Sequence, residues 1–172
     1  MFKEYYQVTE FISLRKIRFE YASQITESRK FNKNYLPFLT WIKTLKFTDE
    51  ESLFYIEDKL KNWSANLEWT FEIFWEETLI GDFQIRKTTN WSEIEIGYWL
   101  DYRFRLKNIM STIINFICSI AKSLNINWVI IVADPKNIAS INLAIKLGFK
   151  ETQYWIRKND QKLGLLTFAK QI

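Results

Sequence analysis

The sequence predicts a mixed α/β fold: one mostly antiparallel sheet of about seven strands, with helices on both faces. Three observations predict it. Residues 69–100 contain three alternating segments that are rich in β-branched and aromatic residues. The apolar spacing then changes to a helical period over 109–124. A continuous apolar run at 127–134 follows, which indicates a central strand buried on both faces.

The N-terminal third combines one short strand with two helices. The segment "ISLRKIRF" predicts the strand, and helices are expected around 21–30 and 50–61. The second helix carries a start signal, because Thr48 or Asp49 can serve as its N-cap and acidic residues fill its first turn.

Three strands are predicted in the middle of the chain, at 69–75, 78–87 and 92–100. Short turns at 76–77 and 88–91 separate them, so neighbouring strands should pair antiparallel.

The next elements form a strand–helix–strand unit. The strand ending at Leu100, the helix 109–124 and the strand 127–133 make up this unit, so its two strands should lie parallel. A second helix is expected over 137–149, with Gly148 as its C-cap.

A hairpin around 159–160 closes the chain. The predicted order is β, α, α, β, β, β, α, β, α, β, β. With 172 residues and no Pro- or Gly-rich linker, the chain is expected to form a single domain over 1–172.

The charge balance bears on the partners. The chain carries 24 Lys and Arg against 20 Asp and Glu, a net charge of +4. This suits an anionic ligand, but the basic residues are spread along the chain, so direct nucleic-acid binding is not expected. A nucleic-acid-associated protein is the weakest functional interpretation, because it depends on the pI of about 9.0 alone.

Other features bear on the compartment. The first residues lack the apolar core of a signal peptide, and no apolar run reaches the ~18 residues of a membrane span. Cys118 is the single cysteine, which excludes an intramolecular disulfide and favours a reducing compartment. It lies in an apolar run and is expected in the core. A cytoplasmic protein without membrane contact is predicted.

Histidine is absent from the sequence. Its absence removes the commonest general base, the Ser–His and Cys–His nucleophile pairs and most zinc sites. Any catalysis therefore has to use carboxylates, hydroxyls, backbone groups or bound water, and no metal site is expected.

Four segments match one known pattern. "LIGDFQI" and "EIGYWL" match its third and fourth strands, "DPKNIASINLAIKLGF" matches its Asn-x-x-Ser helix with a Leu-Gly-Phe ending, and "NYLPFLTWI" matches a Leu-rich, Trp-containing segment. In these segments the chain resembles the GNAT superfamily of acyl-CoA-dependent N-acyltransferases, above all the branch that acetylates ribosomal-protein N-termini. The likeness is strong over 69–150 and moderate before it.

The resemblance implies a reaction and its setting. In the family, strands 4 and 5 are a parallel pair that splays apart, here expected at 97–100 and 129–134. Acetyl-CoA, the acyl donor, enters this wedge, and a primary amine attacks its thioester directly. A backbone N–H at Trp99 or Leu100 would polarise the thioester carbonyl, as an oxyanion hole does.

The resemblance also places the pyrophosphate on the N-terminus of helix 109–124. The family pattern is Gln/Arg-x-x-Gly-x-Gly/Ala, and the residues implied in cofactor contact are Arg105, Leu106, Lys107, Asn108, Ile109 and Met110. Leu106 and Asn108 replace glycines. Asn tolerates the left-handed conformation best, whereas Leu106 blocks the site if its side chain points inward and permits binding if it points away. Arg105 and Lys107 could compensate by contacting phosphate; the alternative is a solvated turn.

The candidate base is a carboxylate on the strand that precedes this loop. Glu93, Glu95, Gly97 and Trp99 alternate along the strand and share one face. If that face lines the cleft, Glu95 is the better-placed base; the alternative is a solvated strand face. Asp134 is a weaker candidate that could equally cap the next helix.

The resemblance names two more residues. Ser140 is the hydroxyl of the Asn-x-x-Ser segment and a candidate acid for the leaving thiolate; the alternative is a hydroxyl in the first turn of a helix. Asn137 is expected to be the N-cap of that helix, and by resemblance it also contacts the cofactor.

The predicted function is therefore an acetyl-CoA-dependent N-acetyltransferase that acts on a primary amine. The acceptor could be a protein N-terminus or a small amine, and a homodimer is compatible with the sequence. The alternative is a catalytically inactive GNAT-like module that binds CoA or regulates another protein, and the missing loop glycines are its only support.

Overall fold

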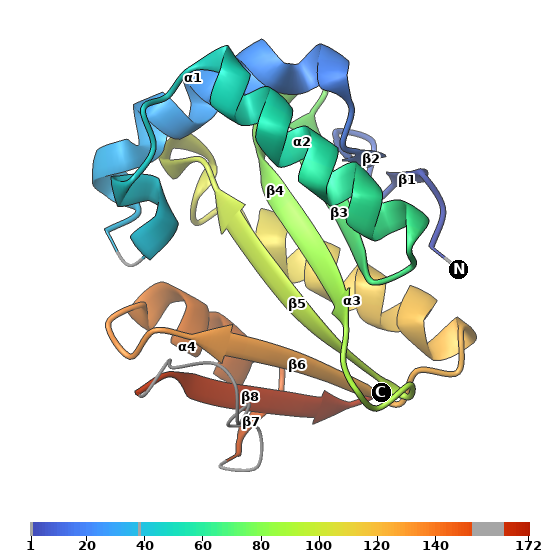
Figure 1. The fold of residues 1–172 in the computed structure, drawn as a ribbon. Coiled ribbons are helices and arrows are strands. Elements are labelled where there is room, and N and C mark those ends of the chain that lie inside the picture. Colours follow the sequence, from blue (N-terminus) through green and yellow to red (C-terminus); the bar gives the residue numbers. More distant parts are fainter. Residues whose placement is uncertain (1, 38, 153–163) are drawn as a thin grey trace. The chain divides into compact units, whose positions relative to one another are not determined.

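The computed structural model describes residues 2–37, 39–152 and 164–172, and Figure 1 labels its elements. Four α-helices are present in this part of the chain. They are α1 (Ala22–Asn32), α2 (Asp49–Ser64), α3 (Ile109–Ser123) and α4 (Ile138–Lys146). Short 3-10 turns lie at η1 (Phe19–Tyr21), η2 (Lys33–Tyr35), η3 (Thr40–Lys43) and η4 (Tyr102–Phe104). No described helix has both the length and the apolar content of a membrane span.

The described strands form one sheet of eight, in the order β1-β2-β3-β4-β5-β6-β8-β7. They are β1 (Tyr5–Gln7), β2 (Ile12–Lys16), β3 (Glu68–Trp75), β4 (Thr78–Lys87), β5 (Glu93–Leu100), β6 (Trp128–Ala133), β7 (Lys150–Glu151) and β8 (Leu166–Gln171). β5 and β6 are parallel, and β6 and β8 are antiparallel. The predicted mixed α/β fold is confirmed.

The predicted elements match the observed ones closely. The additional strand is β1, whose three residues are too few to give an alternating pattern. The predicted closing hairpin is seen in the antiparallel pairing of Lys150 with Ala169 and of Glu151 with Phe168. Its turn at 159–160 lies outside the described residues.

The described chain divides into two compact units, and each is taken by itself below. The first unit contains Met1–Ile85 and Tyr98–Met110. The second contains Arg86–Gly97 and Ser111–Ile172. The expectation of a single domain over 1–172 stays a prediction.

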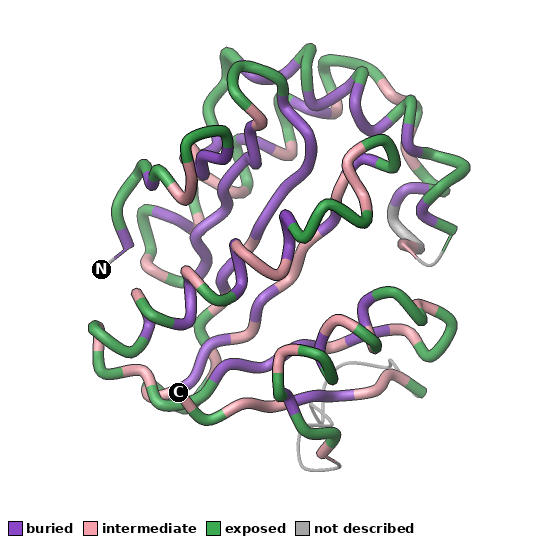
Figure 2. The backbone as a smooth tube through the Cα atoms, turned by 180° about the vertical axis from the view of Figure 1, so that it is seen from behind, coloured by how far each residue is buried: buried purple, intermediate pink, exposed green. Residues whose placement is uncertain are grey.

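The first unit packs α1 and α2 on the sheet strands that surround them in sequence. Thr48 caps α2, since its side chain accepts a hydrogen bond from the N–H of Glu51 at 3.3 Å, so of the two predicted caps Thr48 is the correct one. Figure 2 shows buried residues concentrated along the strands. One core cluster of this unit consists of Ile17, Tyr21, Ala22, Ile25, Ile56, Phe74 and Leu79.

Gly81 in β4 permits a close approach to β5. A Cβ atom at this position would lie 2.3 Å from the carbonyl oxygen of Trp99, which no side chain can tolerate. The Trp99 side chain is buried with Leu36 and Ile42, so the end of β5 is anchored on both sides of its backbone.

The second unit contains the parallel pair and the two C-terminal helices. Asn137 caps α4, as predicted, and Gly148 follows its last turn with a φ of +80°. The N–H of Phe149 then reaches back to the carbonyl of Ala144 at 3.0 Å. Cys118 is buried in α3, as predicted, and burial raises the pKa of its thiol.

Candidate functional site

The pairing between β5 and β6 ends partway along both strands. The register runs from Glu93↔Trp128 to Ile96↔Ile131, whereas β5 continues to Leu100. β6 keeps its pairing with β8 as far as Ala133. The predicted separation at 97–100 in β5 fits this register. The prediction for β6 began too early, at 129, because its residues up to Ile131 still pair with β5.

The loop after β5 begins with a buried acid. The Oδ1 atom of Asp101 accepts the backbone N–H of Arg103 at 2.9 Å, and the Arg103 guanidinium donates to Oδ2 at 2.7 Å. Burial would raise the pKa of Asp101, but hydrogen bonds from Arg103 outweigh it and hold that pKa below its ordinary value. The side chain of Asn32 accepts the N–H of Tyr102 at 2.8 Å, so α1 also fixes the loop.

The two positions where the resemblance expects glycine adopt the glycine conformation. Leu106 has a φ of +62° and Asn108 a φ of +58°. The left-handed region costs a residue with a side chain roughly 1–2 kcal/mol, and Asn tolerates it better than Leu. The Leu106 side chain is fully exposed to solvent. The loop therefore has a backbone conformation typical of glycine at both positions, without glycine at either.

The basic residues of this loop hold neighbouring groups. Arg105 donates to the carbonyl of Tyr35 at 2.9 Å, and the Lys107 ammonium lies 5.1 Å from the centre of the Phe104 ring. Ile109 and Met110 begin α3 with buried side chains. Only the backbone N–H groups of these two residues are therefore suited to an anion, because their side chains belong to the core.

Glu95 in the second unit is held by an arginine. The Nη1 atom of Arg86 donates to Glu95 Oε1 at 3.0 Å, and both side chains are partly exposed. Gly97 leaves room for this arginine, since a Cβ atom there would lie 3.4 Å from Nη1. The ion pair keeps the Glu95 carboxylate oriented on this strand face.

Glu93 lies two residues earlier in β5 and is 1% exposed. Its Oε1 atom has no hydrogen-bond partner among the described residues. Burial raises the pKa of this carboxyl, although Asn90 and Thr88 oppose the shift. Glu93 is therefore a buried carboxylate with unused hydrogen-bonding capacity.

Asn137, Ser140 and Asp134 lie around the start of α4. The Asn137 side chain accepts the N–H of Ser140 at 3.2 Å, and Ser140 is buried. Asp134 accepts the N–H of Lys136 at 2.8 Å through Oδ1, and its carbonyl accepts the N–H of Asn137 at 2.8 Å. Asp134 thus shapes the turn before the helix, while the helix cap itself is Asn137.

The predicted site residues fall on both units. Trp99, Leu100 and the loop through Met110 belong to the first, and Glu95, Asn137 and Ser140 belong to the second. Sequence reasoning missed Arg86, although strand alternation and the short turn at 88–91 place it on the same face as Glu95. Within the described chain, His, Cys, Asp and Glu form no group of three or more that could hold a metal ion.

A buried charge cluster in the first unit was also missed. Asp82 accepts the hydroxyl of Tyr55 at 2.6 Å, and the Arg29 guanidinium lies 4.0 Å from the same oxygen. That guanidinium also lies 3.9 Å from the centre of the Tyr55 ring. Burial raises the pKa of the nearby Glu72 well above its ordinary value, with Asp82 adding to the shift. Its only sequence signal is an acidic residue inside each of two apolar strands.

A family model described as the acetyltransferase (GNAT) domain matches residues 12–150. The chain thus belongs to the GNAT family of acetyltransferases. No curated protein sequence matches it significantly.

Solved structures share its fold at low identity. A RimL ribosomal L7/L12 α-N-protein acetyltransferase in complex with coenzyme A has a TM-score of 0.84 and 19% identity, covering 98% of each chain. The microcin C7 self-immunity acetyltransferase MccE, in complex with acetyl-CoA and AMP, has a TM-score of 0.84 and 22% identity, covering 96% of this chain and 94% of its own. An acetyltransferase from Salmonella typhimurium that modifies the N-terminal serine of L7/L12 has a TM-score of 0.82 and 19% identity, covering 98% and 99%.

Proposed function

We propose that this chain transfers the acetyl group of acetyl-CoA to a primary amine by direct attack on the thioester. The observation that carries the proposal is the loop before α3. Leu106 and Asn108 hold left-handed φ values at the two positions where the family pattern has glycine. Left-handed non-glycine residues occur elsewhere in the chain, but only these two fall at the glycine positions of the family pattern, and residues in such sparsely populated conformations cluster at ligand sites. The structures of RimL with coenzyme A and of MccE with acetyl-CoA support the donor.

The loop and the first turn of α3 would hold the pyrophosphate. The unpaired N–H groups at a helix N-terminus and the helix dipole favour an anion there. Arg105 and Lys107 stand in the same loop and add positive charge. The exposed Leu106 side chain packs against no core residue, so it is free to stay clear of the ligand.

The end of β5 would present the thioester. Beyond Ile96 the β5 backbone is no longer paired with β6, so its N–H and C=O groups are suited to the pantetheine arm. The backbone N–H of Trp99 or Leu100 would polarise the thioester carbonyl. The buried Trp99 side chain fixes this part of the backbone.

Glu95 would take the proton from the attacking amine, directly or through a water molecule. The Arg86 ion pair holds its carboxylate in place. Ser140 would donate a proton to the leaving thiolate, and Asn137 would contact the cofactor in addition to capping α4. No histidine is needed for this reaction.

The acceptor is a primary amine of a peptide N-terminus or of a small molecule. The RimL structures are of ribosomal-protein acetyltransferases and MccE is a self-immunity enzyme, so this fold serves more than one acceptor. A cytoplasmic location fits the single buried cysteine. A homodimer remains compatible with the chain.

Thermal shift and thiol release together test the proposal. Acetyl-CoA at 100 times its dissociation constant should stabilise the protein by about 2.7 kcal/mol. No shift at millimolar acetyl-CoA would overturn both the enzyme and the cofactor-binding module. A shift without thiol release across a panel of amines and N-terminal peptides would favour the inactive module.

A further inference from the structure

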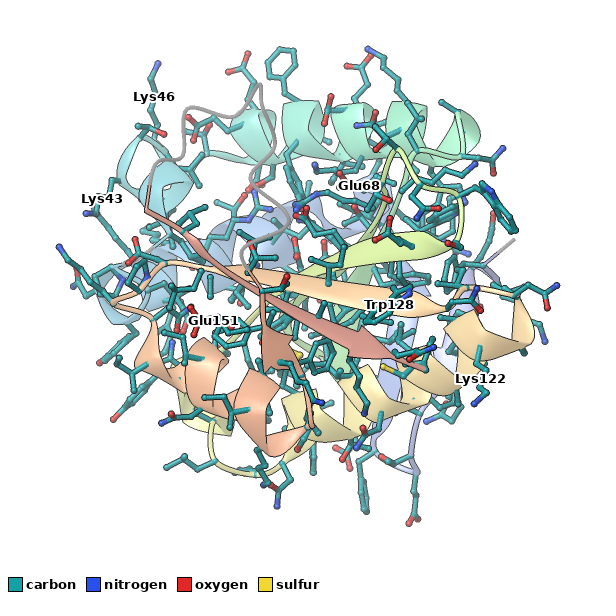
Figure 3. All side chains as sticks on the ribbon, turned by 90° about the horizontal axis from the view of Figure 1, so that it is seen from below. Lys43, Lys46, Glu68, Lys122, Trp128 and Glu151 are labelled. Atoms are coloured by element: carbon teal, nitrogen blue, oxygen red, sulfur yellow. The ribbon has the colours of Figure 1, made fainter. Side chains whose placement is uncertain are left out.

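An open pocket of about 750 Å³ lies on the sheet of the second unit. Its lining includes Glu93 of β5, Trp128 of β6, Lys150 and Glu151 of β7, and Gln171 of β8. Figure 3 labels Trp128 and Glu151 on their strands. The proposed transfer reaction gives this pocket no role, although it lies on the strand that carries the candidate base.

The strand register places the pocket on the same sheet face as Glu95. Glu93, Trp128 and Gln171 are direct partners and form one row across β5, β6 and β8. Glu95, Ile130, Ala169 and Lys150 form the next row. Directly paired residues, and residues two apart on a strand, project on one side of a sheet. Glu93 is therefore separated from Glu95 by about 7 Å along the strand.

Glu93 gives the pocket a group that requires a partner. Its side chain is 1% exposed, and its Oε1 atom has no donor among the described residues. A buried carboxylate oxygen without a donor lowers stability, and a ligand that supplies an N–H relieves this cost. Trp128 lies beside it in the same row with 39% of its surface exposed, so an indole ring is also available. A carboxylate next to an aromatic ring is suited to an alkylammonium group.

The other charged residues of the pocket lie on the edge strand or project to the opposite side of the sheet. Lys150 is on the edge strand β7, separated from Trp128 by β8. Glu151 pairs with Phe168 and therefore projects to the opposite side of the sheet from Lys150. Lys170 pairs with Val129 and also projects to that opposite side. On the face that carries Glu93, the end formed by β5 and β6 is therefore acidic and aromatic, and Lys150 lies at the outer edge of the sheet.

We propose that Glu93 and Trp128 bind a second alkylammonium group of the acceptor, about 7 Å from the amine that reacts beside Glu95. This inference rests on the proposed function, which it deepens by giving the acceptor a second cationic group. Such a group can come from a small diamine or from a lysine side chain near the N-terminus of a peptide. Both sources present the same chemistry to Glu93.

Calorimetric titration of the full chain tests the site without any turnover. The probes are 1,4-diaminobutane and 1-aminobutane, which differ only in the second ammonium group. The diamine is expected to bind on the order of tenfold more tightly than 1-aminobutane, because its second ammonium group adds one charged hydrogen bond to Glu93. The proposal is overturned if the diamine and the monoamine bind with equal affinity and the two peptides described below also bind with equal affinity.

Two matched variants separate the site from general attraction. Glu93→Gln should remove the preference for the diamine, whereas Glu151→Gln, which removes the same charge from the same pocket lining, should keep it. An equal loss in both variants would contradict the proposal. Trp128→Leu should weaken binding of the diamine several-fold, and melting curves of all three variants establish that they are folded.

A peptide pair distinguishes the two sources. A tripeptide with lysine at its second position is compared with one that has methionine there. A preference for the lysine peptide identifies a peptide acceptor, and a preference for the diamine alone identifies a small amine; each supports the site. A retained preference without acetyl transfer to any amine would overturn the proposed function and leave this site standing.

Discussion

Two clusters in this chain have the same composition and different surroundings. The first unit holds one arginine with two carboxylates, Arg29 with Glu72 and Asp82, and all three side chains are buried. The second unit also holds one arginine with two carboxylates, namely Arg86, Glu93 and Glu95. Here the arginine and Glu95 are partly exposed, and Glu93 lines an open pocket.

The comparison shows that a charged cluster inside a sheet does not by itself mark a functional site. In the first cluster the partners of Asp82 are the chain's own Tyr55 and Arg29. Such a cluster contributes to structure, and its cost is desolvation. Each cluster holds one buried carboxylate oxygen without a donor among the described residues, on Glu72 and on Glu93. Glu93 also lines an open pocket, so a ligand can supply the missing donor there, whereas Glu72 is not among the residues that line that pocket.

The largest expected effect is on stability in the first cluster. Arg29→Ala should lower the free energy of unfolding by about 3–5 kcal/mol, because it leaves two buried carboxyls without their cation. Urea unfolding measures this loss, and Lys30→Ala, at an exposed position of the same helix, is the control expected within about 0.5 kcal/mol of wild type. A loss below about 1 kcal/mol would mean that a proton on Glu72 neutralises the cluster without the arginine.

The second cluster should respond in activity instead. Glu95→Gln is expected to lower kcat/KM for the acceptor by about 100-fold or more, because it removes the proposed base. The dissociation constant of acetyl-CoA and the melting temperature should change little. Glu77→Gln, at an exposed acid on the turn between β3 and β4, is the control. An unchanged rate would assign proton removal to another group or to water.

The pH dependence of stability tests the buried cluster of the first unit through the titration of Glu72. The folded-state pKa of Glu72 lies well above its ordinary value, so the unfolded chain loses this proton at a lower pH than the folded protein. Stability from the neutral carboxyl is fully present below the unfolded pKa and is lost as pH rises toward the folded pKa.

Glu72→Gln should therefore flatten the stability profile from about pH 5 to about pH 8 and raise stability at the upper end by on the order of 1 kcal/mol. Denaturant melts at several pH values measure this, with the exposed Glu57→Gln as the control. A profile in the Glu72 variant as steep as that of wild type would place the titration elsewhere.

The smallest expected effect concerns the loop before α3, where the left-handed backbone of Leu106 lowers stability, rather than the burial of a charge. Leu106→Gly should raise stability by roughly 0.5–1 kcal/mol, since the relief of a left-handed Leu exceeds the added freedom of Gly in the unfolded chain. It should also tighten CoA binding.

Leu106→Ala, which shortens the side chain and keeps the strained φ, is the control for the loop and should give neither gain. Calorimetry with CoA and thermal melts measure both quantities. Weaker CoA binding in the glycine variant would show that the Leu106 side chain takes part in binding.

Much of the fold could be predicted from local pattern. The strand 78–87 and the start of the helix at 109 match β4 and α3 because alternation and helical spacing change sharply there. The caps Thr48, Asn137 and Gly148 follow from local chemistry that does not depend on the rest of the chain. β1 was missed because three residues carry no period.

The candidate site was predictable only in part. Strand alternation pointed to Glu95 and the resemblance pointed to the loop residues, but neither could give the partner of Glu95 or the direction of the Leu106 side chain. Arg86 meets Glu95 through the pairing of neighbouring strands, and Glu93 meets Trp128 through the register of β5 and β6, which are separated in sequence by the whole of α3. Such pairings depend on register, which a local pattern does not contain.

By itself, the sequence determined the order of elements, the family and the absence of histidine chemistry, because these depend on residue types and short-range spacing. Tertiary structure alone decided that Leu106 and Asn108 keep left-handed backbone and that Leu106 faces solvent. It also decided that one carboxylate cluster is closed while the other opens on a pocket. Backbone dihedral angles and burial are set by contacts between segments distant in sequence, and for that reason no single segment could reveal them.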